Sequence, residues 1–342
     1  MQASELIARF EKFAPLKLKW EHDPTGLQIG DPHQDIHKVL VTLDVRPEVV
    51  QEAITIGADM IFAHHPVMFR PANNLDYQDP QKAMYAELAA HHILVYAAHT
   101  NLDCAEGGMN DWLAAALDLQ NVQGLVPGYR AQAVKLTLTV PTNQVETVQE
   151  YLTNTVGATL DRYAVNSGEQ FSVDLLADQI PTAVAGINDL AADTWDYQVV
   201  QLLSGGHQYY MGRVGDLPTP LSAQAFAEQC KQVFGVSGLR LVSADPRQRI
   251  TRVAVLGGDG GKFYPQALRA GAQAYVTGDV YYHTGHDMLA AGLTVIDPGH
   301  HIESICKSQL TKLFDQWRVQ AGWPIEIVAS QLNTDSVYLH LS

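Results

Sequence analysis

Basic residues are scarce in this sequence. It holds 22 lysines and arginines against 37 aspartates and glutamates, which gives a formal net charge of −15 at neutral pH. A chain this acidic repels a phosphate backbone at long range, so general nucleic-acid binding is not expected. A single nucleotide is not excluded, because bound metal ions reverse the local electrostatic field.

Long apolar runs and an export signal are also missing. No apolar stretch reaches the roughly 18–20 residues that a membrane-spanning helix needs. The N-terminal stretch MQASELIARFEKFAP mixes charged and apolar residues at helical spacing, without the basic start and continuous apolar segment of a signal peptide. The expected location is therefore the cytoplasm, without membrane association.

Cysteine is rare, and the three cysteines Cys104, Cys230 and Cys306 form no CxxC pair. This spacing argues against a disulfide framework and against a zinc site built from thiolates. A metal ion in this protein would have to be held by nitrogen and oxygen ligands. The chain is nevertheless 46% hydrophobic and 17% charged, so it can bury a core.

Helical and strand-like segments alternate near both ends of the chain. This alternation predicts an α/β fold with parallel or mostly parallel sheets covered by helices. The expected helices are 3–13, 81–92, 109–117 and 223–234, and the expected strands are 38–43, 59–63, 93–98, 252–256, 274–277 and 293–296.

The middle of the chain has a different pattern. A strand-like KLTLTV at 135–140 is followed by a helix-like stretch and then by polar, β-rich sequence up to Gly205-Gly206. We therefore predict a discontinuous core of residues 1–129 and 208–342, with an inserted α+β domain at 130–207.

Chemically active residues follow the expected strands. In α/β sheets, ligands bind beyond the carboxyl ends of strands, where loops from distant sequence positions converge. Nine of the 14 histidines fall in three groups, 64/65, 91/92/99 and 283/286/300/301. The residues at these ends are Asp44, His64-His65, His99, Asp103, the glycine run 257–261, Asp279 and His300.

Imidazole and carboxylate groups together suit Zn²⁺, Fe²⁺, Mn²⁺ or Ni²⁺. Adjacent side chains at a strand end point in different directions, so His64 and His65 could reach two neighbouring ions. A carboxylate such as Glu303 could bridge such a pair. His300 and Glu303 are three residues apart, which places them on one face of a helix start.

Five strings in the sequence resemble the type 2 GTP cyclohydrolase I homologue family, also called the Nif-three-like family. They keep the family's order and spacing, and the resemblance covers roughly 1–127 and 208–342. The strings are FAHHPVMF (62–69), AAHTNLDCAEGGMNDWLA (97–114), VAVLGGDGGKF (253–263), YVTGDVYYH (275–283) and DPGHHIE (297–303).

The resemblance implies a toroidal homohexamer, a trimer of dimers or a dimer of trimers, in which each subunit binds two divalent metal ions. The metal ligands it implies are His64, His65, Asp103, His300 and Glu303. Some relatives place the last glutamate four residues after the histidine rather than three, and either spacing keeps one helical face. Longer members carry an inserted PII/CutA-like, ferredoxin-like domain; residues 134–158 look like its start, while the later part departs from that pattern.

The family name implies a metal-dependent hydrolase that opens the purine ring of GTP with metal-activated water. Proton transfer or support of the ligands could then fall to His99, Asp279 and His283. Backbone N–H groups of Gly257, Gly258 and Gly260 could bind phosphate, although the run lacks the Lys-Ser/Thr ending of a P-loop.

The residues leave other interpretations open. A strand-end aspartate such as Asp44 or Asp279 could cap the next helix, and the glycine run could mark only a tight turn. The protein could be a non-catalytic metal-binding scaffold or regulator, since the inserted domain suits that role equally well. A metal-dependent phosphodiesterase is also compatible with a dinuclear site, but the acidic charge opposes polymeric substrates.

Overall fold

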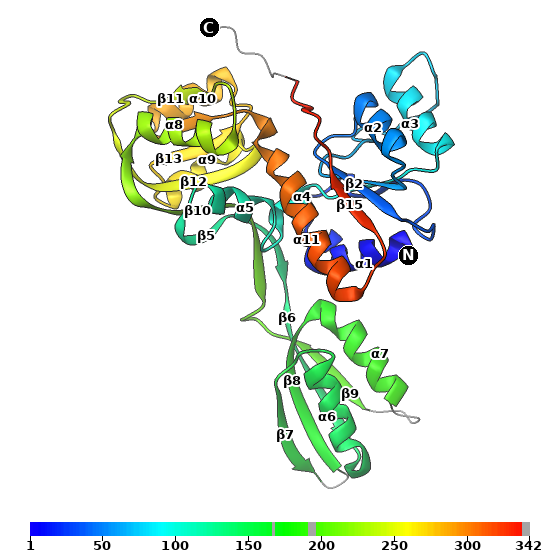
Figure 1. The fold of residues 1–342 in the computed structure, drawn as a ribbon. Helices are drawn as coiled ribbons and strands as arrows, with labels where there is room; N and C mark the ends of the chain where they lie inside the picture. The colour runs from blue at the N-terminus through cyan, green and yellow to red at the C-terminus, as the bar shows by residue number, and fades with distance from the viewer. Residues whose placement is uncertain (166–167, 191–195, 337–342) are drawn as a thin grey trace. The chain divides into compact units, whose positions relative to one another are not determined.

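The computed structural model describes residues 1–165, 168–190 and 196–336. The chain forms two compact units. One comprises Met1–Gly128 together with the described residues from Tyr210 onward, and the other is Tyr129–Tyr209. Each unit has its own sheet structure and its own core (Figure 1).

The first sheet of the larger unit is mixed. Its strand order is β1 (Gly26–Ile29), β4 (Leu94–Ala97), β3 (Met60–Ala63), β2 (Lys38–Thr42) and β15 (Glu326–Ala329). All neighbours are parallel except β1, which pairs antiparallel with β4. Strands β3 and β4 are buried along their whole length, as expected for a sheet with helices on both faces.

Alternate side chains of these strands reach two different cores. On one face, residues such as Leu40 and Ile61 pack with α2 (Pro47–Ile56) and α3 (Pro80–Ala90). On the other face, Phe62 and Tyr96 make aromatic contacts with Phe10 of α1 (Ala3–Phe13), and Phe62 also meets Phe314 of α11 (Ile305–Ala321). Helix α11 of the C-terminal segment therefore packs against the first sheet.

The second sheet is also mixed. Its order is β11 (Arg240–Val242), β14 (Thr294–Asp297), β13 (Ala274–Gly278), β12 (Arg249–Asp259), β10 (His207–Ser222) and β5 (Gln120–Ala131). Strands β12, β13 and β14 are parallel, whereas β10 and β11 are antiparallel to their partners. The helices of this half are α5 (Met109–Ala116), α8 (Ala223–Phe234), α9 (Tyr264–Arg269) and α10 (Tyr282–Ala290).

The smaller unit is an antiparallel sheet with two helices. Its strand order is β7 (Leu160–Val165), β8 (Gly168–Leu176), β6 (Ala133–Val140) and β9 (Tyr197–Gln201). Inward-facing residues of β6 and β8 share one apolar core with α6 (Val145–Asn154) and α7 (Ile180–Leu190).

The predicted fold class, two α/β halves with an inserted α+β domain, is confirmed. Strands β1 and β15 are not among the predicted strands, because each is only four residues long at a sheet edge and lacks a continuous apolar run. Among the helices that the structure describes, none combines the length and apolar character needed to cross a bilayer.

Candidate metal centre

Parallel strands of the first sheet deliver four side chains to one edge. Strand β3 ends at Ala63 and is followed directly by His64 and His65, while β4 is followed by His99 at the start of α4 (Thr100–Cys104). Helix α4 carries Asp103 toward the same edge, where the ring of His99 lies 5.3 Å from that of His64. The convergence follows from the shared direction of the strands.

The remaining two side chains come from the other half of the larger unit. Strand β14 is followed by a short 3₁₀ helix, η5 (His300–Ser304), which lies against β12 and β13. Because a 3₁₀ helix has three residues per turn, His300 and Glu303 lie above one another. Nε2 of His300 lies 3.2 Å from Oε2 of Glu303.

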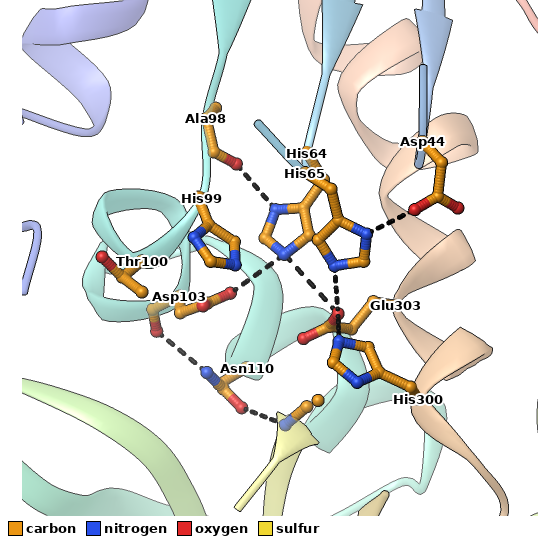
Figure 2. A network of polar contacts seen from close by, with 12 residues as sticks. Asp44, His64, His65, Ala98, His99, Thr100, Asp103, Asn110, His300 and Glu303 are labelled. Carbon is orange, nitrogen blue, oxygen red and sulfur yellow. Dashed lines mark hydrogen bonds and ion pairs between the residues drawn. The ribbon is translucent and has the colours of Figure 1, made fainter. Parts of the chain in front are cut away.

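A single carboxylate oxygen, Oε2 of Glu303, is the centre of the cluster (Figure 2). It lies 3.0 Å from Nε2 of His65 and 3.7 Å from Nε2 of His64, in addition to the contact with His300. Asp103 completes the group, with Oδ1 3.7 Å from Nε2 of His64. The structure therefore brings together all five residues that were predicted as metal ligands.

Each histidine of the cluster is oriented through its other ring nitrogen. Nδ1 donates to a carbonyl or a carboxylate, so that Nε2 faces the interior of the site, an arrangement typical of metal-binding histidines. The pairs are His64 with the carbonyl of Ala98 (2.6 Å), His65 with Asp44 (2.7 Å), His99 with Asp23 (2.8 Å) and His300 with Asp279 (2.7 Å).

Two buried polar atoms of the cluster have no hydrogen-bond partner in the protein. They are Nε2 of His64, whose side chain is fully buried, and Oδ1 of Asp103. Leaving buried polar atoms unpaired costs folding free energy, so such atoms are rare without a reason. A cation between them would satisfy both, and the donor set therefore fits a divalent metal ion.

Burial also shifts the pKa values of the residues in the cluster. Burial lowers the pKa of His64 to about 4, which keeps its imidazole neutral. Burial also raises the pKa of Asp103 well above its usual value, and the charge of Glu303 adds to this effect. For Glu303, burial opposes ionisation, but the imidazoles of His64, His300 and His65 hold its pKa well below the usual range.

Two other histidines of the cluster, His65 and His300, have raised pKa values. Burial acts to lower the pKa of His65, yet hydrogen bonds to Asp44 and Glu303 outweigh it and raise the value to about 10. For His300, contacts with Glu303 and Asp279 outweigh burial and raise the pKa to about 9. Without a metal ion, protons thus supply positive charge beside Glu303.

The residues predicted for proton transfer divide into two groups. His99 lines the pocket beside the cluster, and Asp279 contacts the cluster through His300. Asp279 has a left-handed backbone (φ 52°), and it does not cap the following helix, because Tyr281 stands at the N-cap position of α10. His283 is exposed in the first turn of α10, where its ring meets that of Tyr282, and it does not line this pocket.

Two of the three glycines that were predicted to bind phosphate have N–H groups that are hydrogen-bonded within the protein. The N–H of Gly257 donates to Asn110, and the N–H of Gly260 donates to Thr277, so neither is available to a phosphate. A Cβ atom on Gly257 or Gly258 would lie within 2.9 Å of Oε1 of Glu303. The glycines at 257 and 258 are needed because the carboxylate approaches the backbone closely.

Two supporting residues were not predicted from the sequence. Asp23 lies in an irregular segment before β1 and accepts hydrogen bonds from His99, Thr100 and Thr25. Asn110 of α5 donates to the carbonyl of Asp103 and accepts from Gly257, which ties the two halves of the site together. Neither follows a predicted strand, so the strand-end rule could not find them.

A pocket of about 510 Å³ opens beside the cluster, a size that suits a small ligand. Among its lining residues are His65, His99, Asp103, His300 and Glu303. The lining also contains apolar and aromatic residues, including Trp20, Phe69, Leu256 and Phe263. A ligand in this pocket would therefore meet both polar groups and aromatic rings.

Changing Gly278 to alanine is expected to weaken metal binding by about 10- to 100-fold. A Cβ atom at Gly278 would lie 2.8–2.9 Å from backbone atoms of Gly299 and His300, so the start of η5 would have to move. Competition with a chromophoric chelator measures the affinity. Gly285→Ala is the matched control, because its nearest atoms are 3.7 Å away; equal affinities in the two variants would contradict the expectation.

A family profile, curated sequences and solved structures all match nearly the full length of this chain. The profile of the Duf34/NIF3 (NGG1p interacting factor 3) family matches residues 1–336. A GTP cyclohydrolase 1 type 2 homolog of Listeria monocytogenes is 35% identical over 97% of both chains, and that of Bacillus subtilis is 33% identical over 98% of both. The crystal structure of a Bacillus cereus protein related to NIF3 is 33% identical, covers 99% of both chains and superposes with a TM-score of 0.92. This chain belongs to the Duf34/NIF3 family.

Proposed function

We propose that this protein is a hydrolase that depends on two divalent metal ions and acts on a purine nucleotide such as GTP. The observation that carries the proposal is that two groups of candidate ligands share one carboxylate. His64, Asp103 and Glu303 form one of these groups, and His65, His300 and Glu303 form the second. A third candidate group, His64, His65 and His99, contains no carboxylate. A shared carboxylate is the feature expected where two ions lie side by side.

The donor set would accept zinc, iron, manganese or nickel, because imidazole and carboxylate suit all of them. When bound, such ions act as Lewis acids and lower the pKa of water to near neutrality. The chain's own task is then to hold the substrate, to exclude bulk water and to move a proton.

His99 is the best-placed residue for proton transfer. Its Nδ1 donates to Asp23, so Nε2 is left as the proton acceptor, and the ring lines the pocket. Hydrogen bonds from Thr100 and Thr25 hold the carboxylate of Asp23 in place. Burial acts to raise the pKa of Asp23, but its contacts with His99 outweigh burial and lower the pKa. The imidazole of His99 therefore has one defined orientation, with Nε2 facing the pocket.

The choice of GTP is supported by the relatives, whose printed name is GTP cyclohydrolase 1 type 2 homolog. Opening a purine ring requires water attack on a ring carbon and proton transfer to a ring nitrogen. The pocket offers both the candidate ligands and His99 within one cavity.

Turnover of GTP tests the proposal. Protein reconstituted in turn with zinc, iron(II), manganese and nickel is incubated with GTP, and formate release and pterin fluorescence are measured. We expect turnover with at least one ion, and a loss of about 100-fold or more in His99→Gln with metal content unchanged. Two bound ions without turnover in any of the four preparations would contradict the hydrolase and favour a metal-binding scaffold.

A further inference from the structure

The lining of the pocket contains an aromatic pair as well as the polar candidate ligands. The rings of Trp20 and Phe263 meet edge to face, with centroids 5.2 Å apart and planes at 75°. Phe69, which is 64% exposed, also lines the pocket, and its ring contacts that of His99 edge-on at 6.4 Å. Phe263 is buried, whereas the half-buried ring of Trp20 and the exposed ring of Phe69 provide stacking surfaces for a flat ligand.

A cation lies over this aromatic pair. The ammonium group of Lys262 is 5.0 Å from the ring centroid of Trp20 and 5.0 Å from that of Phe263. Within the described part of the chain, no carboxylate lies within ion-pair distance of this ammonium, although acidic residues outnumber basic ones by 15. Lys262 is also the one lysine or arginine among the lining residues of the pocket.

A chain of hydrogen bonds connects Trp20 of the aromatic pair to His99. The backbone N–H of Trp20 donates to Oγ1 of Thr100 at 2.9 Å, and Thr100 in turn donates to Asp23, the partner of His99. Lys262 and Phe263 belong to η4 (Gly261–Phe263), which follows directly from the end of β12. Trp20 therefore has a defined position relative to His99.

We propose that Trp20 and Lys262 form a recognition subsite for a planar heteroaromatic ring that carries an anionic group. The ring would lie against Trp20, and the anion would pair with the ammonium of Lys262. This inference rests on the proposed function, since it names the substrate class of the same pocket. Stacking on an aromatic side chain accepts any flat base, whereas the lysine requires negative charge, so both features together select the ligand.

Charge explains how such a ligand is oriented. Asp103, Asp259 and Glu303 are the acidic residues that line the pocket, and Lys262 is its one lysine. Because lysine carries its charge on a flexible four-carbon stem, its ammonium can leave the ring faces and follow an anion. The ring then replaces the ammonium over Trp20. The anion can be a phosphate or a carboxylate, because a point charge does not distinguish their geometries.

Calorimetric titration of the full chain reconstituted with zinc tests the subsite. The probes are GMP, guanosine, ribose 5-phosphate and orotate, a ring carboxylate. We expect GMP to bind at least tenfold more tightly than guanosine or ribose 5-phosphate. Lys262→Gln should weaken GMP about tenfold and leave guanosine unchanged, whereas Trp20→Leu should weaken both nucleoside ligands about tenfold.

Conservative variants and a distant control make these results specific. Lys262→Arg and Trp20→Phe should restore most of the affinity, and Lys312→Gln, at an exposed position on α11, should behave as wild type. A parallel loss for orotate in Lys262→Gln would show that the site accepts carboxylates; an effect confined to GMP would assign it to phosphate.

The subsite and the hydrolase can fail separately. The binding pattern without any turnover would retain the subsite and reject the hydrolase. Undetectable GMP binding, equal losses of GMP and guanosine in Lys262→Gln, or unchanged binding in Trp20→Leu would overturn the subsite. GTP turnover with an unaltered KM in both variants would also overturn it, while leaving the hydrolase in place.

Discussion

Replacing Glu303 with glutamine is expected to remove both metal ions, with a loss of affinity greater than 100-fold at each position. The reason is that Oε2 of Glu303 belongs to both groups of candidate ligands, so one neutralised carboxylate affects both ions. Glu303 orients the other ligands only partly. Even a change in a residue that merely supports a metal ligand lowers metal affinity by about 10- to 100-fold. Metal content per chain after dialysis, measured by plasma mass spectrometry, checks the expectation.

The shape of glutamine matches that of glutamate, so the variant changes charge more than packing. Glu228→Gln, at an exposed position on α8, is the matched control and should retain wild-type metal content. Retention of two ions by Glu303→Gln would show that the carboxylate does not bridge. Loss of only one ion would place Glu303 in one group alone.

Replacing Asp103 with asparagine is expected to raise the melting temperature of metal-free protein by a few degrees while weakening metal binding. Burial, reinforced by the charge of Glu303, raises the pKa of Asp103 in the folded protein, and Oδ1 has no hydrogen-bond partner. An ionised carboxylate in this position opposes folding. Asparagine keeps the shape and removes the charge.

The sign of the pH dependence follows from the raised pKa. Folding is favoured by the protonated carboxyl below the unfolded-state value of about 4, and this stability is lost as pH rises toward the higher folded-state value. The advantage of Asp103→Asn over wild type should therefore be large at neutral pH and small near pH 4. Thermal melts in chelator at both pH values measure it, with the exposed Asp287→Asn on α10 as control.

Saturating metal should reverse this ranking, because a ligand that binds only the folded state stabilises it. Wild type would then melt above Asp103→Asn. A variant that is less stable than wild type in chelator at neutral pH would contradict the account of Asp103 as a destabilising, function-bearing carboxylate.

The strand-end rule placed the ligand candidates among a wider set of polar residues, and the family resemblance implied which five of them bind metal. His64 and His65 follow β3, and His300 follows β14 on a 3₁₀ helix, where spacing alone places Glu303 above it. The sequence also contains continuous apolar runs, which define the buried parallel strands. These features depend on residues close together in the chain or on the direction of strands.

The features that were not predicted depend on contacts between residues that are far apart in the sequence. Asp23 meets His99 from 76 positions earlier in the sequence, and no local pattern marks that contact. The glycines at 257 and 258 suggested a phosphate loop, but their need arises from the carboxylate of Glu303 packed against the backbone. His283 lay in a histidine-rich string, yet the first turn of α10 leaves it exposed.

Assembly into a homohexamer stays a prediction, because it comes from the family resemblance and depends on surfaces between subunits. Light scattering of the purified protein would measure the mass of the assembly directly. The inserted antiparallel sheet is present as predicted, and any ligand-sensing role for it also stays a prediction.

Anomalous X-ray diffraction from crystals of the full chain grown with zinc tests the central claim most directly. The account predicts two anomalous peaks on either side of the Glu303 carboxylate, one within about 2.0–2.2 Å of Nε2 of His64 and the other equally close to Nε2 of His65 and His300. Strong peaks elsewhere on the protein, with none beside Glu303, would contradict it.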